Sequence, residues 1–349
     1  MPQLIVTADT LNFYTTIPVS PDDNSGLVGM VFRGKIINAD LDPASVNWYK
    51  DANGFFYSGV ALEESINYNS LMGGISAEWK NTNGRGINVA ILDTGCFDHS
   101  ALNNSIVASY NAVAKTTDVT DVSDNSHGTF IAGLIAARNN TSLTGVAPEV
   151  NLIIVKVANN EIGVVGTDVL EGLNWLNTQC PVKPDIVNIS LDFDPFPDGD
   201  TFKQLFAAMY DNNIITFAAG QNDANLITTH IFYPAAETNV IGVGALAAGS
   251  LNTDDYKNIN TLIKYIIPDI DYYSTGNSGT FTINNGCSFS TAITSGVFAL
   301  LFSFLKPGNS LTDIITLFEK STNFLDRQFN NGLKISKNEN QNTTAAINT

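Results

Sequence analysis

Three side chains that could together perform acyl transfer stand far apart in the sequence, each at the boundary of a predicted element. Asp93 follows an apolar run, His127 is one of only three histidines, and Ser288 comes directly before a long apolar segment. Hydrolysis of an amide needs a nucleophile, a base, an acid that orients the base, and donors for the oxyanion. A serine at a helix start lies at the positive end of the helix macrodipole, and its free N–H can point at an oxyanion. The three residue types therefore suit nucleophilic catalysis.

Each of these residues also has a simpler structural interpretation. An Asp at a strand end is often a turn or cap residue, and a Ser at a helix start is usually an N-cap. An Asn after a Gly, as in Gly220-Gln221-Asn222, is commonly part of a turn. A motif of this kind is therefore a hypothesis that depends on where the elements place it.

The elements expected from about residue 86 onward alternate between strands and helices. The strand candidates are apolar and β-branched: Ile87–Leu92, Asn151–Val157, Asp185–Leu191, Ile214–Ala219 and Val240–Ala245. The helix candidates are His127–Ala137, Thr167–Leu176, Thr201–Asn212, Ser288–Leu305 and Leu311–Lys320. This order predicts an α/β fold with a doubly wound parallel sheet flanked by helices.

In such a sheet, ligands bind beyond the carboxyl ends of the strands. Asp93, Ser190 with Leu191, and Gly220 with its two following amides all come at such ends. We therefore expect them at one edge of the sheet. His127 opens a helix as His-Gly-Thr, and we expect Gly128 to leave room there for a substrate backbone.

The first 60 or so residues have a different sequence pattern. Gly and Pro interrupt short runs of residues, and there is no helical periodicity. They predict a small all-β unit with strands at Leu4–Asn12, Gly26–Phe32, Lys35–Ala39, Trp48–Asp51 and Phe55–Val60. We expect domains at 1–62 and 78–332, a polar linker at 63–77, and a frayed polar tail at 333–349.

The sequence around the three candidates resembles the subtilisin-like serine protease family (subtilases, peptidase S8). The resemblance covers about Ser76 to Leu305 and runs through Val89–Gly95, Ser126–Gly133, Gly145–Pro148, Val187–Leu191, Phe217–Gly220, Tyr233–Ala235 and Val240–Gly244. It implies a serine endopeptidase in which Ser288 attacks the carbonyl, His127 transfers the proton and Asp93 holds the imidazolium. It also implies that Ser190 and Leu191 bind a peptide as an added strand, with a loop around Ile162 to Val165 facing them.

The chain departs from the family pattern near the expected substrate. Gln221 stands where the family usually has the oxyanion-donating Asn, so the donor is Gln221 or Asn222. Asp192 replaces a Gly, and Phe232 stands where a small residue commonly lines the primary specificity pocket. With Gly220 these residues complete the expected substrate site. Phe232 predicts a preference for small P1 side chains, and Asp192 suggests basic P1 residues as the alternative.

No cofactor is expected to be required. Many subtilases bind structural Ca²⁺, but Ala101 stands where an aspartate ligand is usual, so calcium stays undecided, with the acidic loops Asp194–Asp200 and Asp254–Asp255 as other places for a cation. The three cysteines, Cys96, Cys180 and Cys287, fit neither a disulfide framework nor a zinc site.

The N-terminal unit resembles a bacterial SH3-like domain. The resemblance rests on Thr7–Asn12, Gly29–Gly34, Trp48–Asp51 and Gly54–Val60. It implies a module that binds a peptide or a cell-wall fragment through an aromatic groove, for which Phe13, Tyr14, Trp48 and Tyr57 are the candidates. Alternatively, these aromatics are simply the core of a small barrel.

Charge and hydropathy restrict the partners. A formal charge of −17 disfavours nucleic acid and anionic membranes. The apolar segment Ile293–Leu305 is shorter than a membrane span of roughly 20 residues, so no membrane span is expected. The N-terminus lacks the features of a secretory signal, which favours a cytoplasmic protein unless a leader is missing from the sequence.

Two other functions stay open beside the endopeptidase. In one, the altered oxyanion site leaves a catalytically impaired, peptide-binding scaffold. In the other, the same acyl-enzyme makes a ligated or cyclic peptide, so that the protein is a transpeptidase or macrocyclase.

Overall fold

A computed structural model of the chain divides it into two compact units, Met1–Asn67 with Ala247–Asp255, and Tyr68–Leu246 with Tyr256–Thr349. In the N-terminal unit the structure describes residues 3–6, 10–14, 17–18, 25–32, 36–41, 48–53, 55–58 and 62–64. In the larger unit it describes residues 75–76, 78–138, 143–195, 198–220, 233–246, 263–268, 270–305, 309–320 and 336–337.

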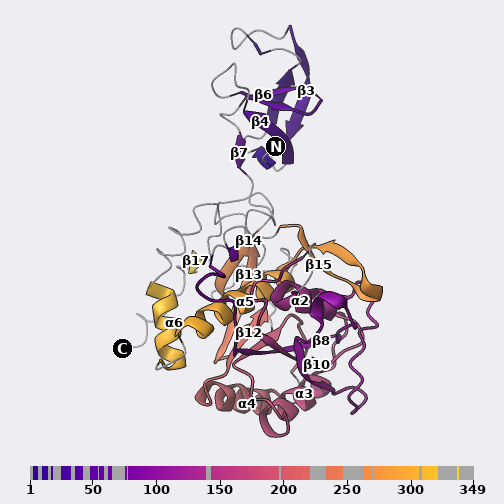
Figure 1. Cartoon of the computed structure of the whole chain (residues 1–349), viewed down its shortest axis with the longest axis vertical. Coiled ribbons are helices and arrows are strands. Elements are labelled where there is room, and N and C mark those ends of the chain that lie inside the picture. Colours follow the sequence, from indigo (N-terminus) through magenta and orange to yellow (C-terminus); the bar gives the residue numbers. More distant parts are fainter. Residues whose placement is uncertain are drawn as a thin grey trace. The chain divides into compact units, whose positions relative to one another are not determined.

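The larger unit is built on an eight-stranded sheet (Figure 1). Seven strands are parallel, and the two-residue β17 pairs antiparallel with β14 at one edge. Their order across the sheet is β17 (Ser336–Lys337), β14 (Ile263–Pro268), β13 (Val240–Leu246), β12 (Ile215–Ala219), β11 (Ile186–Ile189), β8 (Asn88–Asp93), β10 (Asn151–Lys156) and β9 (Ile106–Asn111). β8 therefore has β10 on one side and β11 on the other.

Helices cover both faces of this sheet, which confirms the predicted doubly wound α/β fold (Figure 1). α2 (His127–Ala136) and α5 (Cys287–Leu305) pack together on one face, while α3 (Gly166–Thr178) and α4 (Gly199–Asp211) lie on the other. Because successive strand residues point to opposite faces, Ala90 and Leu92 join the core under α3 and α4, and both faces of β8 are buried.

The helices and strands expected in this unit are present, and their ends differ from the expected ones by at most two residues. α6 (Leu311–Lys320) begins as predicted, since the Ser310 hydroxyl donates to the Asp313 carboxylate at 2.6 Å and accepts from the Asp313 N–H at 3.2 Å. The sequence pattern missed β9, β14 and the hairpin of β15 (Tyr272–Thr275) and β16 (Phe281–Asn284). β9 lies at a sheet edge with Ile106 and Val107 partly exposed, so it lacks the continuous apolar run of a central strand.

Two residues of the polar segment 333–349 take part in the sheet. Ser336 and Lys337 form β17, and they pair with Ile266 and Tyr265 of β14. An unpaired edge strand accepts any extended segment that can supply backbone donors and acceptors, whatever its side chains, and hydropathy therefore gave no signal for this pairing.

The N-terminal unit is a seven-stranded antiparallel sheet, as expected of an all-β unit. Its order is β3 (Leu27–Phe32), β2 (Thr10–Tyr14), β6 (Phe56–Ser58), β5 (Trp48–Asp51), β4 (Ile36–Leu41), β1 (Gln3–Val6) and β7 (Leu62–Glu64). The single strand expected at Leu4–Asn12 is two strands, and β7 occupies the start of the expected linker.

Two of the described aromatic side chains of the N-terminal unit are internal. Tyr14 and Tyr57 are buried, and the ring of Trp48 meets that of Tyr14 edge to face at 5.9 Å. The structure therefore places both tyrosines in the core of the unit. The side chain of Phe13 lies outside the described residues.

α5 is the helix in the described ranges whose length and hydropathy would suit a membrane span, yet 72% of its apolar window is buried inside the fold. It packs so closely on the segment after α2 that a Cβ built on Gly296 would lie 2.6 Å from Cβ of Val146. The absence of a side chain at Gly296 therefore sets the distance between α5 and this segment.

We predict that Gly296→Ala lowers the free energy of unfolding by about 1–3 kcal/mol, because the added methyl overpacks the contact with Val146. Gly199→Ala is the control, since a Cβ at that helical position meets nothing within 4 Å. The control should leave stability unchanged or raise it by up to about 1 kcal/mol. Equal stability of the two variants in urea unfolding would contradict the packing described.

Candidate active site

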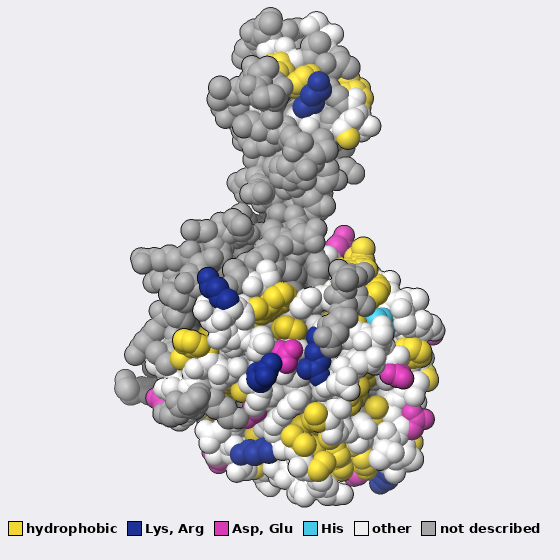
Figure 2. All heavy atoms as spheres, viewed as in Figure 1, with side chains coloured by type: hydrophobic (Ala, Val, Ile, Leu, Met, Phe, Trp, Pro, Cys, Tyr) yellow, Lys and Arg dark blue, Asp and Glu magenta, His cyan; other side chains and the backbone are white. Residues whose placement is uncertain are grey.

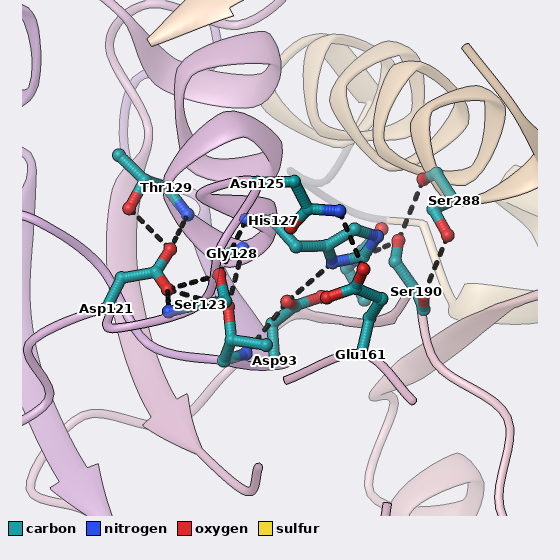
Figure 3. Close-up of polar contacts among 12 residues, drawn as sticks. Asp93, Asp121, Ser123, Asn125, His127, Gly128, Thr129, Glu161, Ser190 and Ser288 are labelled. Atoms are coloured by element: carbon teal, nitrogen blue, oxygen red, sulfur yellow. Dashed lines mark hydrogen bonds and ion pairs between the residues drawn. The ribbon is translucent and has the colours of Figure 1, made fainter. Parts of the chain in front are cut away.

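Three separate elements bring Asp93, His127 and Ser288 to one edge of the sheet (Figure 3). Asp93 is the last residue of β8, His127 the first of α2, and Ser288 the second of α5. Asp93 Oδ1 lies 2.7 Å from His127 Nδ1, and both side chains are at most 5% exposed. A buried carboxylate that accepts from Nδ1 directs Nε2 of the imidazole away from it.

The imidazole is also held by packing and by the start of its helix. Its ring centroid lies 5.5 Å from that of Phe289, the residue after Ser288. The His127 N–H donates to the Ser123 hydroxyl at 3.1 Å. The ring is thus fixed by groups from β8, α5 and the loop before α2.

Ser288 is joined to the end of β11 by two reciprocal hydrogen bonds (Figure 3). Its hydroxyl donates to the Ser190 carbonyl oxygen at 2.9 Å, and the Ser190 hydroxyl donates to the Ser288 carbonyl oxygen at 2.8 Å. Within the described residues, the Ser288 hydroxyl makes no hydrogen bond to His127. In this resting arrangement the serine is held beside the imidazole by the strand and not by the histidine.

A buried polar chain supports the Ser190 side chain. Asn188 Nδ2 donates to the Ser190 hydroxyl, and the Ser295 hydroxyl donates to Asn188 Oδ1, each at 2.9 Å. All three residues are buried. They connect β11 to α5 and so fix the register between Ser190 and Ser288.

The pKa of His127 is raised above its ordinary value of 6.5. Burial alone lowers the pKa, because it disfavours the charged imidazolium, but the charge and the hydrogen bond of Asp93 outweigh it. Glu161 and Asp121 add smaller contributions in the same direction. The site therefore favours the protonated imidazole, which is the form that follows removal of a proton from a nucleophile.

Behind the imidazole lies a buried carboxylate, Asp121, that organises both neighbouring loops (Figure 3). It accepts hydrogen bonds from the hydroxyls of Thr94, Ser123 and Thr129 at 2.7–3.0 Å, and from the N–H groups of Ser123 and Thr129. Burial raises the pKa of Asp121, but these bonds outweigh it and hold the pKa below its ordinary value. Asp121 thus fixes the residue after Asp93 relative to the first turn of α2.

Lys156 is a buried positive charge close to these carboxylates. It is aligned with Asp93 between β10 and β8, and its ammonium donates to the Thr94 carbonyl oxygen. Burial lowers the pKa of Lys156, while the charges of Asp121, Asp118 and Asp93 oppose that shift. Thr94 is therefore held by hydrogen bonds at both its hydroxyl and its carbonyl oxygen.

Gly128 serves a different purpose from the one expected. A Cβ at this position would lie 2.2 Å from the Gly95 carbonyl oxygen, so the loop after β8 and not a substrate backbone fills the space. The Gly128 N–H donates to the Thr94 hydroxyl at 2.9 Å. The glycine permits β8 and α2 to approach closely enough for Asp93 to reach His127.

The remaining candidates are placed as follows. Leu191 is buried and Asp192 is exposed, directly after Ser190 at the end of β11. Gly220 directly follows β12, and its N–H donates to the Val243 carbonyl oxygen at 2.7 Å. Gln221, Asn222 and Phe232 lie outside the described residues.

The structure describes some, but not all, of the residues that the sequence suggested as cation sites. Among the described residues, no three His, Cys, Asp or Glu side chains group as metal ligands. Ala101 is buried, and residues 254–255 are outside the described ranges. Cys96, Cys180 and Cys287 are free cysteines.

Several polar residues of the site carried no recognised signal in the sequence. Asp121 and Asn125 stand in a polar loop whose sequence is typical of solvent exposure, and Ser295 is embedded in an apolar helix. Glu161 is one acid among many in an acidic chain. The one usable signal was Ser295, because a hydroxyl within a buried helix needs a partner.

We predict that Asp121→Asn lowers the free energy of unfolding at pH 7 by about 1.5–3 kcal/mol. The NH₂ group of the new asparagine would face hydrogen-bond donors, where the carboxylate accepts. The folded-state pKa is lowered, so this contribution is complete above the unfolded pKa near 3.9 and is lost as pH falls through the folded pKa. The gap between wild type and variant should shrink in acid.

Asp118→Asn is the control for that measurement. Asp118 accepts comparable bonds from the Thr120 N–H and hydroxyl but is exposed to solvent. Its replacement should change stability much less. Equal losses for the two variants in urea titrations at pH 7 would contradict the role given to Asp121.

Comparison with known proteins agrees with the fold. Residues 84–334 match the Subtilase family. The chain is 32% identical over 257 residues to the "Major intracellular serine protease" of Bacillus subtilis (strain 168), covering 70% of this chain and 79% of that protein. It is 31% identical over 230 residues to the "Intracellular serine protease" of Paenibacillus polymyxa, covering 64% and 69%.

A solved structure described as "Proteases from Pseudoalteromonas arctica PAMC 21717" superimposes with a TM-score of 0.60 at 22% identity. The superposition covers 71% of this chain and 86% of that one, and it shows a shared fold. Together with the family match over residues 84–334, these likenesses show that the chain belongs to the subtilase family of serine proteases.

Proposed function

We propose that the protein is an endopeptidase that hydrolyses peptide bonds through an acyl-enzyme on Ser288, with His127 as general base and acid and Asp93 as the group that orients it. The observation that carries this proposal is the buried 2.7 Å contact between Asp93 and His127 beside Ser288 at the carboxyl edge of the sheet. In this proposal the reaction uses only groups of the protein and water, without a cofactor.

In the proposed reaction the Ser288 oxygen attacks the peptide carbonyl carbon while His127 Nε2 takes the hydroxyl proton. The carbonyl π electrons move to oxygen, and collapse of the tetrahedral intermediate breaks the C–N bond as His127 returns its proton to the leaving amine. Water then attacks the ester with the same proton transfers. It releases the acid and restores Ser288.

The oxyanion needs two donors near Ser288. The Ser288 N–H lies in the first turn of α5, where N–H groups have no acceptor within their helix. The side chain of Gln221, or else that of Asn222, supplies the second donor in our proposal, since both follow the end of β12 at the same edge.

Before attack, the Ser288 hydroxyl must turn from the Ser190 carbonyl to the imidazole. This is a rotation about one side-chain bond, and catalytic hydrogen bonds are often looser in the absence of substrate. The rotation frees the Ser190 carbonyl. That carbonyl is then available to accept from the backbone of a peptide added along Ser190 to Asp192.

The opposite wall of the proposed cleft is the segment between β10 and α3. Ile162 and Val165 in this segment are 84% and 53% exposed. Large apolar side chains exposed beside a candidate site are typical of a surface that binds a partner. We therefore assign this segment, with Ser190, Leu191, Asp192 and Gly220, to the binding of the peptide, and Phe232 to a narrow P1 pocket.

For the N-terminal unit we propose an SH3-like module that recognises a peptide or a cell-wall fragment. The antiparallel arrangement of short strands supports this assignment. Among the aromatics expected to form a groove, the burial of Tyr14 and Tyr57 leaves Trp48, which is half-buried, as the described one that a ligand could contact.

The most direct test is labelling with a fluorophosphonate probe. We expect wild type to be labelled at Ser288, Ser288→Ala not to be labelled, and Asp93→Asn to be labelled about 10⁴-fold more slowly at neutral pH, because the imidazole then takes the wrong tautomer. Probe attachment that persists in Ser288→Ala would sink the proposal. Absence of labelling in folded wild type would favour the peptide-binding scaffold, and product masses would distinguish hydrolysis from peptide ligation.

The pH dependence gives an independent prediction. His127 acts as a base only when it is unprotonated, and its pKa is raised above 6.5. The acid limb of kcat/KM for the free enzyme should therefore have its midpoint above pH 6.5, with activity rising as pH increases through it. A midpoint well below 6.5 would show that another group controls the reaction.

A further inference from the structure

A carboxylate next to the imidazole has no role in the proposed reaction. Glu161 lies in the segment between β10 and α3, and its Oε1 accepts a hydrogen bond from Asn125 Nδ2 at 2.7 Å. Asn125 stands two residues before His127. Figure 3 shows the Glu161 carboxylate beside the His127 ring, on the side of Asp93.

The sheet topology places Glu161 at one wall of the cleft. β10 runs parallel to β8 with Lys156 aligned to Asp93, so the segment after β10 emerges at the same edge as Asp93. β11 flanks β8 on the other side and leads into Ser190. A peptide whose carbonyl reaches Ser288 therefore passes between the Glu161 segment and Ser190.

Asn125 is arranged to hold Glu161. Its Oδ1 is buried and has no hydrogen-bond partner among the described residues, an arrangement that costs stability. Turning the amide over would satisfy neither group, because Oδ1 would then face a carboxylate. The contact that this side chain makes with Glu161 is therefore its main contribution at the site.

Glu161 has no cationic partner of its own in the described part of the chain. It is half-buried, and Ile162 next to it is largely exposed, so solvent and substrate reach this segment. The charged groups around the imidazole are Asp93, Asp121 and Glu161, with Lys156 behind them and bound to Thr94. Of these carboxylates, Asp93 is bound to His127, and Asp121 accepts hydrogen bonds from Thr94, Ser123 and Thr129.

We propose that Glu161, held by Asn125, is a specificity-determining residue that selects substrates with a Lys or Arg side chain at the position lying against His127. The inference rests on the proposed function, because it requires a peptide to bind beside Ser288. An ammonium or guanidinium there would replace water as the partner of a half-buried carboxylate. Such a charge-assisted hydrogen bond gives a preference of about tenfold.

The test compares kcat/KM for matched peptides that carry Lys or Gln at each position from three residues before to two residues after the cleaved bond. Wild type should prefer Lys about tenfold at one of these positions, and Glu161→Gln should remove that preference while it still cleaves the Gln peptide. Salt at about 0.5 M should reduce the preference in wild type.

Glu78→Gln is the matched control variant. Glu78 also accepts from an Asn side chain, since Asn81 Nδ2 donates to its Oε2 at 3.0 Å, but it lies outside the site. This variant should keep the Lys preference. Asp192→Asn tests the exposed carboxylate of Asp192, which also lies in the proposed cleft. A Lys preference that depends on Asp192 and not on Glu161 would overturn the inference.

Binding separates this inference from the proposed function. The same peptides are titrated against Ser288→Ala and against Ser288→Ala with Glu161→Gln, with fluorescence anisotropy as the readout. A Lys preference that Glu161→Gln removes, in cleavage or in binding, supports the role of Glu161. If neither assay shows such a preference, the role of Glu161 is overturned. If neither wild type nor Glu78→Gln cleaves the peptides, it is the proposed function that fails.

Discussion

The architecture of the site depends on one interaction, the buried hydrogen bond between Asp93 and His127. A carboxylate and an imidazole that are both removed from water attract each other strongly, but only if their geometry is held. The chain maintains this geometry by packing β8 closely against α2. Gly128 leaves no side chain between them, Thr94 bonds to the first turn of α2, and Asp121 fixes both loops.

The serine side is organised separately from the histidine side. α5 is anchored to β11 by Asn188, Ser190 and Ser295, and the Ser190 carbonyl holds the Ser288 hydroxyl in the resting arrangement. The two halves meet where the Phe289 ring packs against His127. Neither half relies on a direct bond between Ser288 and His127, so the fold places both groups without one.

Much of the fold could be predicted from the sequence because buried parallel strands are continuous apolar runs and the helices alternate with them. Asp93, His127 and Ser288 were identifiable because each stands at an element boundary within a family-like segment. The structure brings all three to one edge of the sheet. Residues such as Asp121 and Asn188 were not assigned roles, because a polar residue acquires its function from partners distant in sequence.

Local patterns also failed where pairing and close approach decide the structure. Nothing in Ser336–Lys337 marks an edge strand, since its pairing comes from β14. Gly128 was expected to admit a substrate, yet its space belongs to the backbone of Gly95. In both cases the controlling feature is a contact with another element, which the residue type alone does not reveal.

A crystal structure of the phosphonylated protein would show whether Asp93 orients His127 toward Ser288. We predict a covalent bond from phosphorus to Ser288 Oγ, His127 Nδ1 still bound to Asp93, and His127 Nε2 within hydrogen-bond distance of Oγ or of a phosphonyl oxygen. An adduct on Ser288 whose neighbouring imidazole has turned away from it, or has left Asp93, would contradict the account.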